Sequence, residues 1–347
     1  MKAILQSLGL FLLSCPFVWG QATITALERD FESIEQSQEV TCFRLATLEQ
    51  VPVELNMQLE VGDELIGTGS TNLELECAGG SRLRFSGEFR VMLAPTAEGQ
   101  DCAINLLAGN ANVTSEEPTG MISGETTLGS AGTIYEFRVS RGAEGDLNQE
   151  CVVYEGQVDV NYGPRWRGRL SGGQKADFKR GRARRIRLQK EDIERVAALY
   201  ARLDVSKARL ESGRDPTGKP ARNVRQAAYS ELVALYQEAL TRPKDSDARL
   251  RLAIRQLDYS INDEAFYHLR RAESSAVDKT QKAYIALTQA TLYSKTGDRK
   301  KAEQQFQRAR RHDPKLFKAG ELRLEQVDKQ RLQQFMKKEI KKPPRRH

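Results

Sequence analysis

Apolar and polar residues alternate along much of the first half of the chain, from about residue 40 to residue 187. Leu73, Leu75 and Cys77 alternate with acidic residues, and the same period of two recurs in later segments. The other alternating apolar sets are Leu83 with Phe85, Phe89 with Val91 and Leu93, and Val158 with Val160. Such alternation is typical of antiparallel strands with one face in the core and one in water, so Glu74 and Arg84 are expected on the wet face. Short strands separated by frequent glycines predict a β-sandwich or β-roll.

The spacing becomes helical near residue 190, where Ile193, Ala197, Tyr200 and Leu203 share one helix face. Glycine and proline interrupt this pattern between residues 211 and 220, and helical spacing resumes near Asn223. We therefore predict an α+β chain with an all-β part followed by an all-α part. The expected segments are a β-domain at 21–188, a helix and linker at 189–222, helical repeats at 223–335, the last helix being a capping helix at 322–335, and a basic disordered tail at 336–347.

The helical half contains an internal repeat. Ala253, Ala265, Leu269 and Ala272 recur 37 residues later as Ala290, Ala302, Phe306 and Ala309. The second copy adds Tyr293, Gly297 and Pro314, and a partial earlier copy consists of Leu232, Tyr236, Ala239 and Pro243. The repeated alanines let two helices approach closely, and Tyr293 and Phe306 fill the space between them. The repeat predicts stacked helical hairpins that bury one another.

The second copy reads A-x2-Y-x3-G-x4-A-x3-F-x2-A-x4-P and resembles the tetratricopeptide repeat. This resemblance implies an array that binds other proteins, with the first helix of each hairpin lining the binding surface. Those helices are expected at residues 247–261 and 279–295. The exposed polar candidates on them are Arg251, Arg255, Lys282 and Gln289. Because most of these residues are basic, their charge favours an acidic ligand, which could be the β-domain of another copy of the chain.

The β-domain carries six short motifs whose order resembles the FecR domain. They are centred on Gly62-Asp63, Gly79-Gly80-Ser81, Gly109, Gly132-Thr133, Glu155-Gly156 and Gly172. The chain departs from that pattern at residue 79, where glycine replaces the usual aspartate, and in carrying four cysteines. The resemblance implies a bacterial envelope domain used for interaction. The signal relay of FecR itself needs a cytoplasmic segment and a membrane span, so that role is not expected here.

The first 20 residues have the pattern of a secretory signal. Lys2 precedes an apolar stretch, and Val18 and Gly20 suit cleavage before Gln21. An alternative is lipoprotein processing with a lipid on Cys15. No other stretch is long and apolar enough to predict a membrane span. We therefore expect export to the periplasm, with a lipid anchor as the alternative.

Four cysteines remain after such cleavage: Cys42, Cys77, Cys102 and Cys151. An even number in an exported protein favours two disulfides. Four cysteines allow three pairings, and pairing of Cys42 with Cys77 and of Cys102 with Cys151 is weakly preferred because neighbouring strands usually pair. The alternative is four buried thiols.

The charge is divided unevenly along the chain, whose net charge is +7. Residues 23–161 hold 24 acidic and 7 basic residues, a net of −17, whereas residues 162–347 hold 23 acidic and 46 basic residues, a net of +23. Opposite charges of this size favour attraction between domains of one molecule or of neighbouring molecules. Self-association is therefore an expected property.

Residues 165–190, the basic segment, hold eleven basic residues and one acid, Asp177. The arginines proposed as a basic surface are Arg165, Arg167, Arg169, Arg182, Arg184, Arg185 and Arg187. Such a surface suits an anionic envelope glycan, lipid head groups or an acidic partner. The alternatives are an edge strand protected from aggregation and docking onto the acidic β-domain.

Residue patterns for chemistry are absent from the sequence. The three histidines lie far apart, and no metal-ligand spacing, nucleophile motif or nucleotide-binding loop is present. We therefore predict no enzymatic activity and no cofactor, and export makes nucleic acid an unexpected partner. The leading interpretation is an exported adapter that binds a protein, and the second is an envelope-glycan or cell-wall binding protein using the basic segment.

Overall fold

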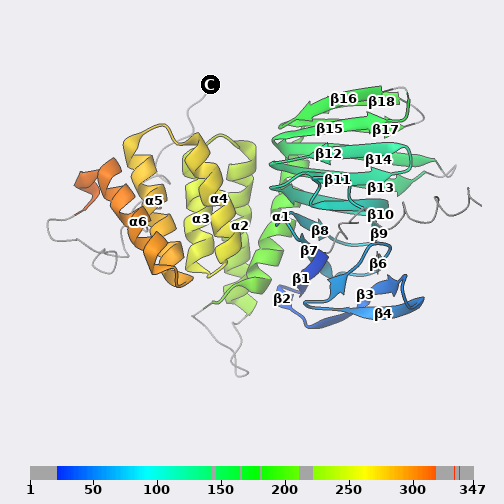
Figure 1. Cartoon of the computed structure of the whole chain (residues 1–347), viewed down its shortest axis with the longest axis horizontal. Coiled ribbons are helices and arrows are strands. Elements are labelled where there is room, and N and C mark those ends of the chain that lie inside the picture. The colour runs from blue at the N-terminus through cyan, green and yellow to red at the C-terminus, as the bar shows by residue number, and fades with distance from the viewer. Residues whose placement is uncertain are drawn as a thin grey trace, which may run out of the picture. The chain divides into compact units, whose positions relative to one another are not determined.

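The computed structural model describes residues 22–142, 146–164, 166–179, 182–210 and 222–317, together with Leu332 and Met336. The expectations for the signal segment, Cys15, Arg165, the loop at 211–220 and nearly all of residues 318–347 lie outside this part. The chain divides into two compact units. The β unit contains residues 22–27 and 34–187, and the helical unit contains residues 28–33 and those from Leu188 onward (Figure 1). The predicted order, an all-β part followed by an all-α part, is confirmed.

The β unit is built from short strands. They are β1 (Ala22–Arg29), β2 (Glu32–Ser33), β3 (Gln36–Arg44), β4 (Glu49–Glu54), β5 (Gln58–Leu59), β6 (Glu64–Gly67), β7 (Asn72–Cys77), β8 (Arg82–Phe85), β9 (Phe89–Leu93), β10 (Cys102–Ser115), β11 (Thr119–Ser123), β12 (Thr126–Ser130), β13 (Thr133–Arg141), β14 (Leu147–Glu155), β15 (Gln157–Tyr162), β16 (Trp166–Ser171), β17 (Gln174–Lys179) and β18 (Arg182–Arg187).

These strands form two sheets that share β10. In sheet A the order is β1, β7, β8, β10, β13, β14, β17 and β18, and the two-residue strands β2 and β5 pair with β1. In sheet B it is β4, β3, β6, β9, β10, β11, β12, β15 and β16. Strands β10 and β11 run parallel, whereas consecutive strands such as β13 and β14 form antiparallel hairpins. In Figure 1, β3 and β4 lie at one end of the β unit, and β16 and β18 lie at the other.

An apolar core lies between the two sheets. Leu73, Leu75 and Phe85 of sheet A and Val91 and Val158 of sheet B belong to one cluster of buried side chains. These residues alternate along their strands, as the sequence predicts. Burial of each Leu, Phe or Val side chain stabilises a fold by about 1.5–3 kcal/mol. The alternating apolar residues therefore supply much of the stability of the sandwich.

Strand β10 changes sheets at Gly109. Its first half pairs with β9 and β11, and its second half pairs with β8 and β13. Gly109 has a φ of +92°, and a Cβ at this position would lie 2.5 Å from the carbonyl oxygen of Glu88. Only glycine accepts both this backbone conformation and this close approach without strain. The residue therefore fixes where the chain leaves one sheet for the other.

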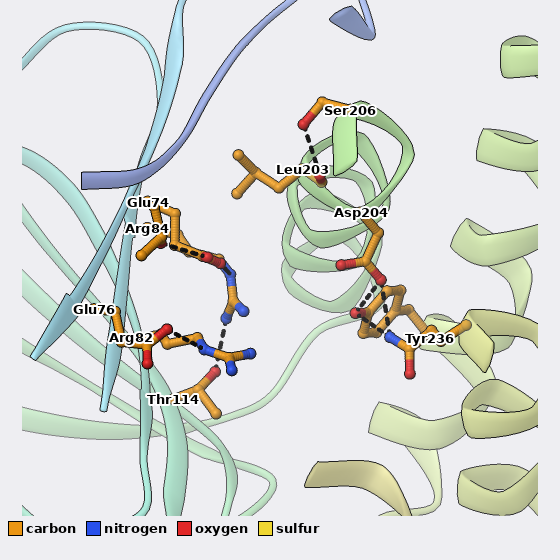
Figure 2. A network of polar contacts seen from close by, with 11 residues as sticks. Glu74, Glu76, Arg82, Arg84, Thr114, Leu203, Asp204, Ser206 and Tyr236 are labelled. Carbon is orange, nitrogen blue, oxygen red and sulfur yellow. Dashed lines mark hydrogen bonds and ion pairs between the residues drawn. The ribbon is translucent and has the colours of Figure 1, made fainter. Parts of the chain in front are cut away.

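The face of sheet A that points away from the core is buried in part. Glu74 and Arg84 are each 1% exposed, so the prediction that they lie on a wet face is wrong. Arg84 donates from Nε to Glu74 at 2.7 Å and from a terminal nitrogen to the Thr114 hydroxyl at 2.8 Å (Figure 2). The Thr25 hydroxyl also donates to Glu74, at 2.9 Å. Burying a charged side chain is costly unless it is paired and hydrogen-bonded, as these two are.

The helical unit contains six described α-helices. They are α1 (Lys190–Lys207), α2 (Arg222–Thr241), α3 (Ser246–Asp258), α4 (Asn262–Ser275), α5 (Lys279–Lys295) and α6 (Arg299–His312), and a short 3-10 turn, η1 (Pro314–Leu316), follows. The helices pack as the hairpins α1–α2, α3–α4 and α5–α6, and α2 contacts α3 as α4 contacts α5. Helix α1 therefore belongs to the stack, although the sequence suggested a separate helix with a linker.

The repeated residues occupy corresponding places in two hairpins. Ala253 and Ala265 are fully buried between α3 and α4, as Ala290 and Phe306 are between α5 and α6. Aspartates begin three of the helices: the Asp245 side chain accepts from two backbone N–H groups of α3, and Asp278 and Asp298 cap α5 and α6. Caps of this kind contribute about 1 kcal/mol each.

Candidate interaction surfaces

A buried polar network joins the first two hairpins. The Asp204 carboxylate on α1 accepts hydrogen bonds from the Tyr236 hydroxyl on α2 at 2.7 Å and from the Gln256 amide on α3 at 2.8 Å (Figure 2). Burial raises the pKa of Asp204 to about 7, and the negative charge of Glu264 adds to this effect. Asp204 is 2% exposed, so the network is placed to hold helices together and not to meet a ligand. No motif in the sequence indicated this network.

Two of the four predicted partner-binding residues are buried. Arg251 is 6% exposed and pairs with Glu238, and Gln289 is 5% exposed and donates to Glu273 at 2.9 Å. The expectation that Arg251 and Gln289 are exposed is therefore wrong. Both residues lie on the first helix of a hairpin and bind an acid on the second helix of the preceding hairpin. They tie neighbouring hairpins together, a role that the repeat pattern within one hairpin does not show.

The other two predicted residues are half-buried. Arg255 pairs with Glu231 at 2.6 Å and with Asp258 at 3.1 Å, so its charge is neutralised within the helical unit. Lys282 lies near His312, whose pKa is lowered by burial and then by neighbouring positive charges that include Lys282. Of the four predicted residues, Lys282 therefore best fits an accessible position.

Two apolar residues near the end of the chain pack into the helical unit. Met336 is 5% exposed and belongs to the cluster formed by α3, α4 and α5. Leu332 packs against this cluster and also against the one between α5 and α6. Both residues have helical backbone, and their spacing of four puts them on one helix face. Met336 was expected to begin a disordered tail, and its burial contradicts that expectation. The spacing of four residues between Leu332 and Met336 is the feature of the sequence that could have indicated this burial.

The junction covered by Leu332 and Met336 is apolar. Leu250 and Ile254 of α3 and Tyr284 of α5 belong to the cluster that includes Met336, and α3 and α5 are in contact. This part of the array therefore packs against two apolar residues, Leu332 and Met336, that lie four positions apart in the sequence. The same arrangement recurs wherever an amphipathic helix binds in a groove.

The basic segment wraps around the end of the β unit instead of forming one flat surface. Arg167 and Arg169 on β16 share the outer face of sheet B with Asn161 and Asp159, their register partners. Arg184 on β18 lies opposite Asp177 on sheet A. Arg187 on β18 is exposed, and Arg182 lies in the same strand, although its side chain falls outside the described part.

Arg185 and Trp166 close the gap between the two edge strands. The Arg185 guanidinium lies 5.7 Å from the centre of the Trp166 ring and donates to the backbone oxygen of Arg169 at 3.3 Å. Trp166 also packs edge-on against Phe178 of the core. A Cβ at Gly168 would lie 2.8 Å from the Trp166 ring. Side chains therefore seal this end of the sandwich, and the described arginines Arg167, Arg169, Arg184 and Arg187 are exposed.

One disulfide is present among the described cysteines, and it joins Cys77 to Cys102. Cys42 and Cys151 are buried and free. The expected pairing of Cys42 with Cys77 and of Cys102 with Cys151 is therefore wrong. Cys77 ends β7 of sheet A and Cys102 begins β10 in sheet B, so the bond crosses between sheets instead of following strand order. Burial raises the pKa of Cys42 to about 11 and that of Cys151 further, which keeps both thiols protonated.

Each unit has an open pocket lined by both polar and apolar residues of the described part of the chain. The pocket in the helical unit, about 330 Å³, is lined by Arg209, Glu231 and Tyr259 among others. The pocket in the β unit, about 380 Å³, includes Asp159 and Arg169, which bind each other through two hydrogen bonds of 2.6 and 3.1 Å. Within the described ranges, no group of three or more His, Cys, Asp or Glu side chains is placed to hold a metal ion.

No protein-family model matches the sequence, and no curated protein matches it. Two crystal structures of a proposed anti-sigma factor from Parabacteroides distasonis align with part of the chain, at 11% and 10% identity and a TM-score of 0.34 in both cases. The alignments cover 39% of this chain and 64% of that protein, so the chain spans less than two thirds of its length. In the part of the chain that the structure describes, no helix combines the length and apolarity that a membrane crossing requires.

Proposed function

We propose that the protein is an exported, non-enzymatic adapter that acts in the cell envelope and binds a protein partner through its helical unit. A FecR-like β-domain and a tetratricopeptide-type array are the domain identities that the sequence motifs favour. Stacked hairpins with equivalent small residues at equivalent places support the second. The buried disulfide-bonded pair is what an oxidising compartment such as the periplasm would allow.

The observation that carries this proposal is the apolar junction of α3, α4 and α5. It already holds Leu332 and Met336 from the same chain, so its shape and chemistry suit a helix that presents apolar residues four positions apart. A partner helix with that spacing would compete for the same place. Lys282 lies on α5, the first helix of its hairpin, and would add an electrostatic contact to an acidic residue of the partner.

The test is recovery of a partner from envelope extracts by the mature chain and by two variants. Leu332→Asp with Met336→Asp removes the intramolecular occupant, and Gln304→Asp on the exposed side of α6 is the matched control. We expect one protein to be recovered by the mature chain and by the control, and several-fold more of it by the double variant. Equal recovery by all three forms, or no recovered protein, would contradict the proposal.

Export has its own measurement. Mass spectrometry of the protein from a cell envelope should find Gln21 at the N-terminus, because Val18 and Gly20 suit the signal peptidase. A lipid-modified Cys15 would instead place the protein on a membrane surface and support the alternative of a lipoprotein.

Binding to an anionic envelope glycan is a second candidate function. It is favoured by the exposure of Arg167 and Arg187, neither of which has an acidic partner in the described structure. Purified cell wall should retain the chain at low salt and lose the double variant Arg167→Glu with Arg187→Glu. Equal retention of both forms would exclude this surface as the glycan site.

A further inference from the structure

The β unit is electrically polar from one end to the other. Residues 34–67, which contain β3 to β6, hold seven acidic residues and one basic residue. Residues 157–187, which contain β15 to β18, hold ten basic residues and two acidic ones. The strand order of sheet B puts β4 at one edge and β16 at the other, so these two segments form opposite ends of one rigid sandwich (Figure 1). We call them the acidic end and the basic end.

The acidic end exposes carboxylates without cationic partners. Glu35, Glu49 and Glu60 are exposed, and no ion pair joins any of them to a described residue. Two large apolar side chains are exposed beside them, Leu45 at 54% and Leu48 at 71%. Exposed apolar side chains rimmed by polar residues are a feature of surfaces that bind other proteins.

The basic end has the complementary property. Arg167 contacts only the amide oxygen of Asn161, at 3.3 Å, and Arg187 has no anionic partner in the described ranges. Arg185 is held over Trp166, so its charge is fixed at the end of the sandwich while the guanidinium stays exposed. Arginine presents a planar group that binds carboxylates through two hydrogen bonds, which suits the glutamates of the other end.

We propose that the partner of these two ends is a second copy of the chain, bound head to tail, with the acidic end of one molecule against the basic end of the next. The contact is heterologous, because it uses two different surfaces, and each bound pair still offers one free end of each kind. Association therefore continues into longer assemblies or closes into a ring. This proposal concerns the β unit and does not depend on the function proposed for the helical unit.

The two edge strands are suited to contact through side chains and not to joining their sheets. Strand β4 contains Pro52, which lacks a backbone N–H group, and β16 carries Arg167 and Arg169. Proline and positive charge are the features by which natural edge strands avoid backbone pairing. Charge pairs between exposed side chains are individually weak and are screened by salt. We therefore expect a reversible assembly that dissociates at high ionic strength.

Analytical ultracentrifugation of the mature chain tests this proposal. At about 50 mM salt, where the screening length is near 14 Å, the mass of the wild type should rise with protein concentration. At about 1 M salt, where that length is near 3 Å, the protein should be monomeric. A wild type that stays monomeric at low salt would overturn the proposal. If such a monomer nevertheless binds a polyanion such as heparin, the basic end serves a polyanion instead.

Charge reversal identifies the surfaces. Glu49→Arg with Glu54→Arg changes the net charge of the acidic end from −6 to −2, and Arg167→Glu with Arg187→Glu changes that of the basic end from +8 to +4, so each variant weakens one of the two surfaces. Each variant alone should associate at least tenfold more weakly than the wild type at low salt, whereas an equimolar mixture of the two should associate again.

A matched control reverses two exposed charges of the helical unit, Arg299→Glu with Lys300→Glu, and should associate like the wild type. Circular dichroism checks that every variant is folded. Recovery of association in the mixture is the result that a merely destabilised variant would not give. If the mixture stays monomeric, or if the control loses association equally, the head-to-tail contact is refuted.

Discussion

The buried Asp204 makes the stability of the helical unit depend on pH, and Asp204→Asn should remove that dependence. The carboxylate is 2% exposed and accepts hydrogen bonds from Tyr236 and Gln256. An asparagine oxygen can accept the same two hydrogen bonds and carries no charge at any pH. Asp263→Asn is the matched control, because Asp263 is exposed on α4 and reports the background of the same chemical change.

The size of this change in stability follows from the pKa of Asp204. Burial raises the pKa of Asp204 from its ordinary 3.8 to about 7, so the folded state binds this proton more tightly than the unfolded state does. The resulting stability is fully present below pH 3.8 and is lost as the pH rises through 7. Three pKa units correspond to about 4 kcal/mol in total, of which about 2.5 kcal/mol falls between pH 5 and pH 8.

The assay is urea unfolding followed by circular dichroism at 222 nm, which reports the helices of this unit. For the wild type, we expect the free energy of unfolding to be about 2.5 kcal/mol lower at pH 8 than at pH 5. Asp204→Asn should show almost no such difference and should exceed the wild type at pH 8, and Asp263→Asn should behave like the wild type. The reasoning is refuted if the wild type is equally stable at both pH values, or if Asp204→Asn keeps the full difference.

Three further predictions concern the disulfide, a buried ion pair and the packing of the helices. Unfolding a chain that begins at Gln21 without reductant should expose two reactive thiols, those of Cys42 and Cys151. Reducing the Cys77–Cys102 bond should lower the free energy of unfolding by about 3.5 kcal/mol for a loop of this length, measured by urea unfolding. Glu74→Gln should cost about 3–5 kcal/mol, because it breaks the buried ion pair between Glu74 and Arg84; an unchanged melting temperature of the β unit would count against it. Ala302→Phe should destabilise the helical unit by about 1–3 kcal/mol through overpacking, seen as an earlier loss of helical signal than in wild type.

The periodic features of the fold were predictable from the sequence. The expected helix at 279–295 coincides with α5, and the alternation at residues 73–77 lies within β7. Both signals are local, because the residues that share one face of a helix or a strand lie only a few positions apart in the sequence. The close contacts at Ala265 and Ala302 were predictable for the same reason, since the repeat displays them twice.

The polar and covalent partnerships were not predictable, because each joins residues that the topology brings together. Cys77 meets Cys102 only because β7 and β10 are placed in a sandwich with a shared strand. Arg251 is buried only because α2 of the preceding hairpin supplies Glu238. From the sequence, an arginine that does not pack within its own hairpin is expected on the surface. The neighbouring hairpin buries Arg251 instead, because it supplies the acid that pairs with it.

Strand β10 has a consequence for how the β unit opens. Each half of this strand is flanked on both sides, by β9 and β11 in one sheet and by β8 and β13 in the other. Neither sheet can detach without breaking the hydrogen bonds of a strand that belongs to both, so local opening at the centre should be rare. The amides of both halves of β10 should exchange with solvent at one common, slow rate, which would make the two sheets a single cooperative unit of folding.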